Sequence, residues 1–62
     1  MEDEAHYFGR IAYEAYCETT EWKSAVTGAP LPQFDDQKEP IQLAWINAAR
    51  AVRVAHDSKR FL

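Results

Sequence analysis

The chain has 62 residues, 47% of them hydrophobic and 27% charged, with a net charge of −3 at pH 7, which is typical of a single globular domain (1–62) and not of a disordered chain. A chain of this length buries only about 60% of the surface that its unfolded form exposes, so it usually needs a disulfide, a metal or a neighbouring subunit. The single cysteine, Cys17, excludes a disulfide within the chain and favours a reducing compartment, and the acidic balance argues against nucleic-acid binding.

The first predicted element is an amphipathic helix from about residue 3 to about residue 20. Acidic residues 2–4 suit the positive end of its dipole. Gly9 lies inside the pattern, where it costs about 1 kcal/mol relative to alanine but allows another backbone to approach closely. At about 100° per residue, one broad face is apolar and is expected to be core, whereas Tyr13 and Cys17 fall on the opposite side. The core residues predicted here are Phe8, Ile11, Ala12, Ala15 and Trp22.

A long connector, from about residue 21 to about residue 38, follows the first helix. Gly28, Pro30 and Pro32 are turn signals, and each proline pushes the residue before it towards an extended conformation. Leu31 and Phe34 can pin the segment over the helices. We therefore expect an ordered strap and not a flexible linker.

A second helix is predicted from about residue 39 to about residue 56, with a short basic tail after it. Asp36 followed by Glu39 matches a capping box, and Pro40 is tolerated in a first turn, which has no use for its N–H. The main apolar face of this helix supplies the rest of the predicted core: Ile41, Trp45, Ala48 and Val52.

Apolar residues also lie on the far side of the second helix. A hairpin has one partner helix and cannot cover both faces, and each large apolar side chain left in water forfeits roughly 1.5–3 kcal/mol. Either the strap around Phe34 or the tail residues Phe61 and Leu62 cover this side, or it meets another copy of the chain, which we favour. The fold class expected is all-α, a two-helix hairpin that assembles as an oligomer. Its interface is predicted at Leu43, Ile46, Asn47, Arg50 and Val54.

The sequence carries no pair of groups spaced for acid–base or nucleophilic catalysis, so no enzyme is expected. His6, Cys17 and His56 lack metal-ligand spacing, and neither a metal nor another cofactor is predicted. Arg10, Tyr13 and Lys23 are the group best suited to hold a planar phosphorylated ligand, because rings stack on bases and cations meet phosphate. No apolar run reaches the length of a membrane span, which predicts a cytoplasmic protein.

Three short segments resemble a group of short phage-encoded proteins: residues 11–17 (IAYEAYC), residues 32–36 (PQFDD), and Ala44-Trp45 with Ala48-Ala49 and Val52. The layout is also distantly similar to the repeat named after the ryanodine receptor. In that repeat Glu14 and the segment Phe34–Asp36 would be the matching positions, which adds Glu14 to the candidate ligand site. The resemblance implies a phage accessory protein that counters a host defence in the host cell cytoplasm.

Three functions are consistent with these patterns. The first is an oligomeric binding protein that docks on a host or phage protein and blocks it. The second is a sponge that sequesters a nucleotide second messenger between subunits. The third is a minor virion or nucleic-acid-associated protein that uses the cations near the C-terminal end, namely Arg50, Arg53, Lys59 and Arg60.

Overall fold

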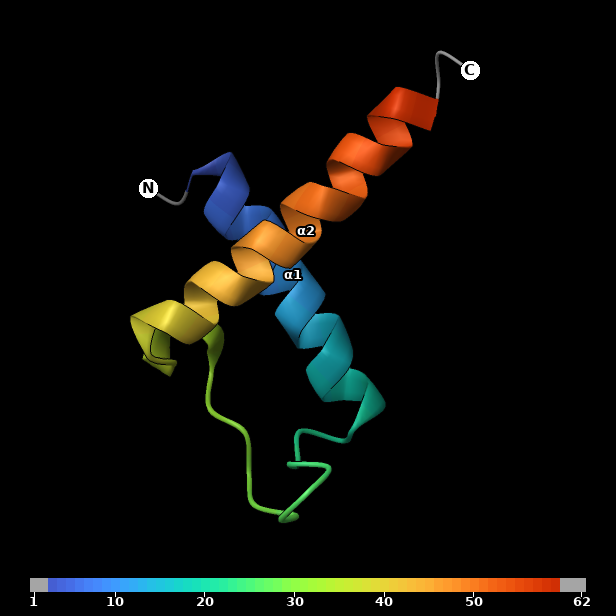
Figure 1. Cartoon of the computed structure of the whole chain (residues 1–62). Helices are drawn as coiled ribbons and strands as arrows, with labels where there is room; N and C mark the ends of the chain where they lie inside the picture. Colours follow the sequence, from blue (N-terminus) through green and yellow to red (C-terminus); the bar gives the residue numbers. More distant parts are fainter. Residues whose placement is uncertain (1–2, 60–62) are drawn as a thin grey trace.

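The computed structural model describes residues 3–59 as two helices that cross each other in an X (Figure 1). The elements are α1 (Glu4–Thr19), the short 3-10 helix η1 (Phe34–Asp36) and α2 (Glu39–Lys59). Within residues 3–59 the protein is a mostly helical, strand-free hairpin whose two helices pack on each other. The cation Arg60 and the tail residues Phe61 and Leu62 lie outside the described residues.

Helix α1 has a hydrogen-bonded cap at its beginning and a sharp backbone turn at its end. The Asp3 carboxylate accepts a hydrogen bond from the His6 backbone N–H at 2.8 Å, which satisfies one of the free donors of the first turn. After Thr19, the backbone of Glu21 and Trp22 adopts φ values of 58° and 59°. Two successive non-glycine residues in this left-handed region cost energy, and they turn the chain sharply away from the helix axis. The Trp22 N–H returns to the Cys17 carbonyl at 2.6 Å and closes the helix end.

The first part of the connector is a closed loop held by backbone hydrogen bonds. The Ser24 N–H donates to the Ala29 carbonyl at 2.7 Å, and the Leu31 N–H donates to the Trp22 carbonyl at 2.8 Å. Gly28 adopts φ 73° at the tip, a conformation that glycine reaches without steric cost. The chain then runs to η1, where Phe34 enters the core.

Helix α2 begins at Glu39, as its sequence predicts, but the predicted capping box is wrong. Asp36 belongs to η1, and the carbonyl of Lys38 accepts the first helical hydrogen bonds. The side chain of Gln42 reaches back and donates to the carbonyl of Gln37 at 2.8 Å. The side chain of Gln42 thus ties the first turn of α2 to the segment that follows η1.

The helices come into close contact where Gly9 of α1 faces Ile46 of α2. A Cβ built on Gly9 would lie 2.5 Å from Ile46 Cγ1 and 3.0 Å from its backbone nitrogen. The close backbone approach predicted for Gly9 is confirmed. The same contact corrects the prediction that Ile46 is an interface residue, because Ile46 is packed within the chain.

The core lies between the helices and the connector and is built around Tyr13. The side chains of Tyr13, Cys17 and Phe34 are buried, with relative exposures of 2%, 0% and 1%. The ring of Tyr13 lies 5.7 Å from that of Phe34 and 5.5 Å from that of Trp45, distances typical of favourable aromatic pairs. Partly buried residues complete this cluster: Trp22, Leu31, Trp45 and Ile46.

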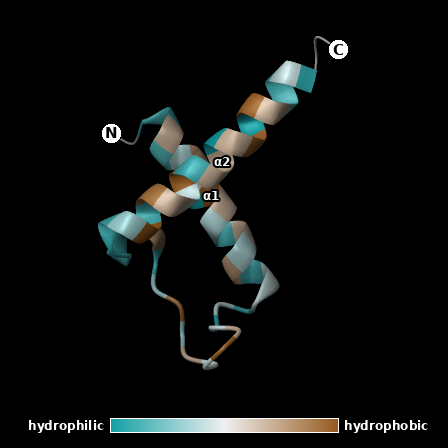
Figure 2. Ribbon diagram, viewed as in Figure 1, coloured by the Kyte–Doolittle hydropathy of each residue, from teal (hydrophilic) through white to brown (hydrophobic). Residues whose placement is uncertain are grey.

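The chain as a whole is open in shape. Its radius of gyration is 13.2 Å, whereas a compact chain of this length has about 10.6 Å. No residue of α2 is buried, and residues 50–59 are all exposed. Figure 2 shows hydrophobic stretches along α2 beyond the crossing, in the half that projects from the hairpin. Within residues 3–59 neither helix has the length and hydrophobicity needed to cross a membrane.

Candidate functional site

An apolar groove lies at the crossing of α1 and α2. Its volume is about 610 Å³. Most of its lining is hydrophobic, and the two polar residues stand towards the projecting end of α2. We call it the main groove, and it is lined by Phe8, Ile11, Ala12, Trp45, Ala48, Ala49, Val52, Arg53 and His56.

The main groove consists largely of residues that the sequence predicts as core. The prediction is wrong for the single chain: Phe8, Ile11 and Val52 are exposed by 39%, 43% and 71%. The packed side of α1 is instead the row Gly9, Tyr13 and Cys17, of which Tyr13 and Cys17 are predicted on the side opposite the core. Ala15, Ile41 and Ala48 are exposed too, Ala12 is half-buried, and only Trp22 and Trp45 of the predicted core pack against the buried cluster.

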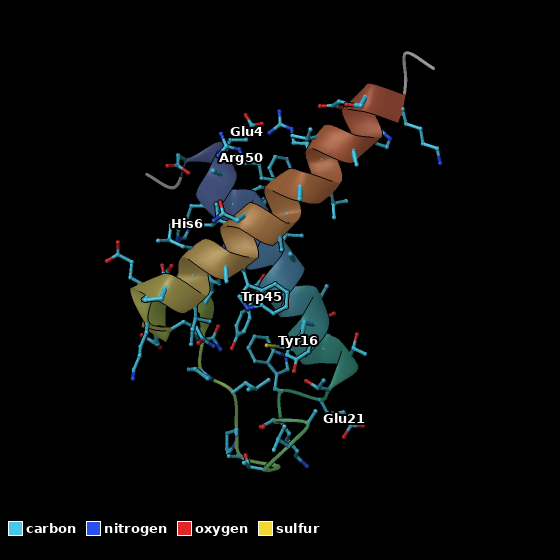
Figure 3. All side chains as sticks on the ribbon, viewed as in Figure 1. Glu4, His6, Tyr16, Glu21, Trp45 and Arg50 are labelled. Atoms are coloured by element: carbon cyan, nitrogen blue, oxygen red, sulfur yellow. The ribbon has the colours of Figure 1, made fainter. Side chains whose placement is uncertain are left out.

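The physical reason for this inversion is the contact at Gly9. Helix α2 approaches α1 at Gly9, where the absence of a side chain lets the two backbones come close. One turn further along α1, the ring of Tyr13 packs against the ring of Trp45 of α2. Trp45 spans the boundary between core and groove, and its ring lies 5.3 Å from that of Tyr16 (Figure 3). The apolar stripes of both helices are then left on one open side of the hairpin.

Charged side chains frame one end of the main groove. Arg53 forms an ion pair with Glu4 of α1, and its guanidinium lies over the Phe8 ring at 5.3 Å from the centroid. The pair ties the start of α1 to the projecting half of α2. Both members are more than half exposed, so their attraction contributes little stability in water. A second hollow of about 380 Å³ lies beside this pair, where Glu4 and Arg50 are labelled in Figure 3.

The far side of α2 keeps its apolar residues in solvent. Leu43 and Val54 are exposed by 48% and 58%, and Asn47 and Arg50 between them are exposed as well. Phe34 is buried against Tyr13, so the strap does not cover this side. We call Leu43, Asn47, Arg50 and Val54 the docking stripe.

The structure does not assemble the predicted ligand site. Tyr13 is buried, and its hydroxyl donates to the Pro32 carbonyl at 2.7 Å and accepts from Gln37 Nε2 at 2.6 Å. Arg10 is engaged by the Glu14 carboxylate at 3.0 Å. Lys23 lies on the connector, exposed, with its backbone bridged to Pro30. Tyr13 thus has no free face for a ligand, because its side chain is an internal support for the connector.

The side chains of His6, Asp35 and Cys17 are engaged in packing or in contacts within the chain. His6 Nε2 lies 2.9 Å from an Asp35 carboxylate oxygen, and its ring meets the edge of Phe34. Asp35 therefore helps to hold η1 against α1. Cys17 is fully buried, out of reach of a substrate. Among residues 3–59, no three potential ligand side chains converge on a metal site.

Replacing Tyr13 with phenylalanine is expected to destabilise the chain by about 1–3 kcal/mol, because the Pro32 carbonyl and the Gln37 amide lose a partner at the edge of the core. Burial, followed by the hydrogen bond with Cys17, raises the pKa of Tyr13 above its ordinary value. Its contribution is therefore fully present below about pH 10 and is lost as the pH rises further.

Urea unfolding at neutral and strongly alkaline pH tests this assignment. The wild-type chain should lose more stability at alkaline pH than the Tyr13→Phe variant. Tyr7→Phe is the matched control, because Tyr7 is 45% exposed. This variant should lose as much stability at alkaline pH as the wild type does. An equal alkaline loss in the wild type and Tyr13→Phe would contradict the assignment.

Comparison with known proteins found no matching family model, no similar characterised protein and no similar solved structure.

Proposed function

We propose that this chain is a non-catalytic binding protein that acts as an oligomer, docks on a host or phage protein through the docking stripe, and blocks it. The observation that carries the proposal is the state of α2. It is a 21-residue helix with no buried residue, and it exposes apolar side chains on two different sides. Isolated helices are marginal in water, and most helical stability comes from packing of an apolar face. Such a helix is therefore suited to binding other proteins.

The spacing of the docking stripe matches a known mode of recognition. Its members stand at positions 43, 47, 50 and 54, which is the i, i+4, i+7 and i+11 series of a helix laid into a groove. Leu43 and Val54 supply apolar anchors near the two ends, and Asn47 and Arg50 stand between them. A partner of matching chemistry has an apolar cleft with an acidic group on its rim, where Arg50 can form a charge-assisted hydrogen bond.

The sequence resemblance to short phage-encoded proteins supports a host or phage protein as this partner, encountered in the host cell cytoplasm. The observations do not favour nucleotide sequestration, because Tyr13 is closed off in the core and Arg10 is held by Glu14. They do not favour nucleic-acid binding either, because Arg53 already forms an ion pair with Glu4.

Site-specific photo-crosslinking in the native host tests the proposal. A photoreactive amino acid is placed at Leu43 or at Val54, and at Val26 as the control. Val26 is 93% exposed on the connector, far along the chain from the docking stripe. We expect positions 43 and 54 to capture the same second protein and position 26 not to capture it.

The captured protein then has to be tested with purified components. The wild-type chain should bind it and lower its activity, and the Leu43→Glu/Val54→Glu variant should bind at least about 100-fold more weakly, because each charge would be buried without a partner. The proposal is wrong if positions 43 and 54 crosslink to no second protein, or if the double variant binds as tightly as the wild type.

A further inference from the structure

The main groove leaves apolar side chains of both helices exposed to water, among them Phe8, Ile11 and Val52. Such an exposed apolar surface on so small a chain indicates a binding partner. We propose that a second copy of this chain covers the main groove, with α1 of each copy packed against α2 of the other. This inference rests on the oligomeric part of the proposed function and gives that oligomer an interface separate from the docking stripe.

The exposed area is of the size that a stable dimer needs. The chain exposes 5029 Å², whereas a compact protein of 7.1 kDa exposes about 4,100 Å². The excess, roughly 900 Å², is close to the ~800 Å² that each partner buries in a standard protein interface. This excess belongs to the chain as a whole, and the main groove is the part of it in which apolar side chains of both helices lie together.

The shape of the main groove suits a symmetric contact with itself. A two-fold interface uses the same patch on both subunits, so the patch must carry both protruding and receiving parts. Phe8, Ile11 and Val52 are large side chains exposed to solvent. Small side chains lie between them and allow the backbone of another helix to approach closely: Ala12, Ala48 and Ala49.

The charges select the pairing of helices within this dimer. Helix α1 carries three glutamates and one arginine, whereas the second half of α2 carries Arg50, Arg53 and Lys59 with a single acid, Asp57. Contact between α1 and the partner's α2 therefore brings an acidic helix to a basic one, in addition to the Arg53–Glu4 pair within each chain. Contact between two copies of α2 would place like charges together, which is destabilising.

The mass of the full chain in solution tests the dimer, with two valines of α2 as a matched pair. Val52 lines the main groove, and Val54, two residues further on, belongs to the docking stripe. Native mass spectrometry and sedimentation across a concentration series should give twice the 7.1 kDa chain mass for the wild type and for Val54→Glu. Val52→Glu should raise the dimer dissociation constant by about 100-fold or more, because its charge would be buried in the interface.

Both substituted valines are exposed in the single chain, at 71% and 58%, so neither variant removes a packed core residue. Far-UV circular dichroism of Val52→Glu, at concentrations where the wild type is dimeric, shows whether the helices persist. A monomeric wild type would overturn the inference, as would a Val52→Glu variant that dimerises as tightly as Val54→Glu. A monomeric wild type would also contradict the oligomeric part of the proposed function. Neither result affects the crosslinks from the docking stripe, so docking on a partner and dimerisation can fail separately.

Disulfide trapping tests which helices meet. Ile11→Cys and Val52→Cys chains are mixed and oxidised with glutathione disulfide, and the wild type, whose only cysteine is buried, is the control. We expect the mixed Ile11–Val52 disulfide between chains to exceed the two symmetric disulfides beyond the statistical ratio. A predominance of the disulfide between two Val52→Cys chains would overturn the pairing of α1 with the partner's α2.

Discussion

Replacement of Gly9 with alanine is expected to destabilise the hairpin by about 1–3 kcal/mol, the typical cost of overpacking. The new methyl group would lie 2.5 Å from Ile46 Cγ1 and 3.0 Å from the Ile46 backbone nitrogen, so α2 would have to move away. Elsewhere in a helix, the same substitution stabilises by about 1 kcal/mol, because alanine has the higher helix propensity. The sign of the change therefore reports whether the helices cross at this residue.

Urea unfolding followed by circular dichroism measures this effect. The double variant Gly9→Ala/Ile46→Ala separates the clash with the Ile46 side chain from the clash with its backbone, because it removes the Cγ1 atom but leaves the backbone of residue 46 in place. If Gly9→Ala proved more stable than the wild type, the close crossing of α1 and α2 would be refuted.

Replacement of Phe34 with alanine is expected to lower the stability of the chain by about 3–5 kcal/mol. Phe34 is 1% exposed, and its ring packs on those of Tyr13 and His6. A chain of 62 residues has a total stability of about 3–9 kcal/mol, so the loss is a large part of the whole. We expect the variant to be largely unfolded at physiological temperature.

Thermal unfolding and limited proteolysis of the connector measure this loss together. Val26→Ala is the control, because Val26 is 93% exposed and its truncation should change stability by less than about 0.5 kcal/mol. A Phe34→Ala variant that melts with the wild type and resists proteolysis equally would show that the connector is not held by Phe34.

The helices were predictable because their signals are local. Helix α1 runs from Glu4 to Thr19 where a helix from about residue 3 to about residue 20 is predicted, and α2 begins at Glu39 as predicted. The end of α2, at Lys59, lies beyond the predicted residue 56 because Asp57 and Ser58 are weak helix formers that do not stop a helix as glycine or proline would. The predicted cap of α2 is wrong because Asp36 lies in η1, and α2 begins only after Gln37 and Lys38.

The core and the ligand site were not predictable from helical periodicity. The helical period of the apolar residues shows which of them share a face, but it does not show against which face the other helix packs. One available signal was the row Gly9, Tyr13 and Cys17, spaced four residues apart, where a glycine permits contact and a tyrosine can find partners for its hydroxyl. Tyr13 appeared suited to a ligand because its sequence neighbours are polar, but the Pro32 carbonyl and the Gln37 amide reach it from the connector.

The sequence by itself determined that this chain is a two-helix hairpin with more apolar surface than a single pair of helices can bury. Periodicity, capping residues and prolines act over a few residues, so they are visible without a structure. Only the tertiary structure decided which of that surface is buried. The choice depends on the close contact of Gly9 with Ile46 and on connector residues far away in sequence that surround Tyr13. The apolar face with the regular spacing was left outside as the main groove, because the backbones approach most closely where one of them carries no side chain.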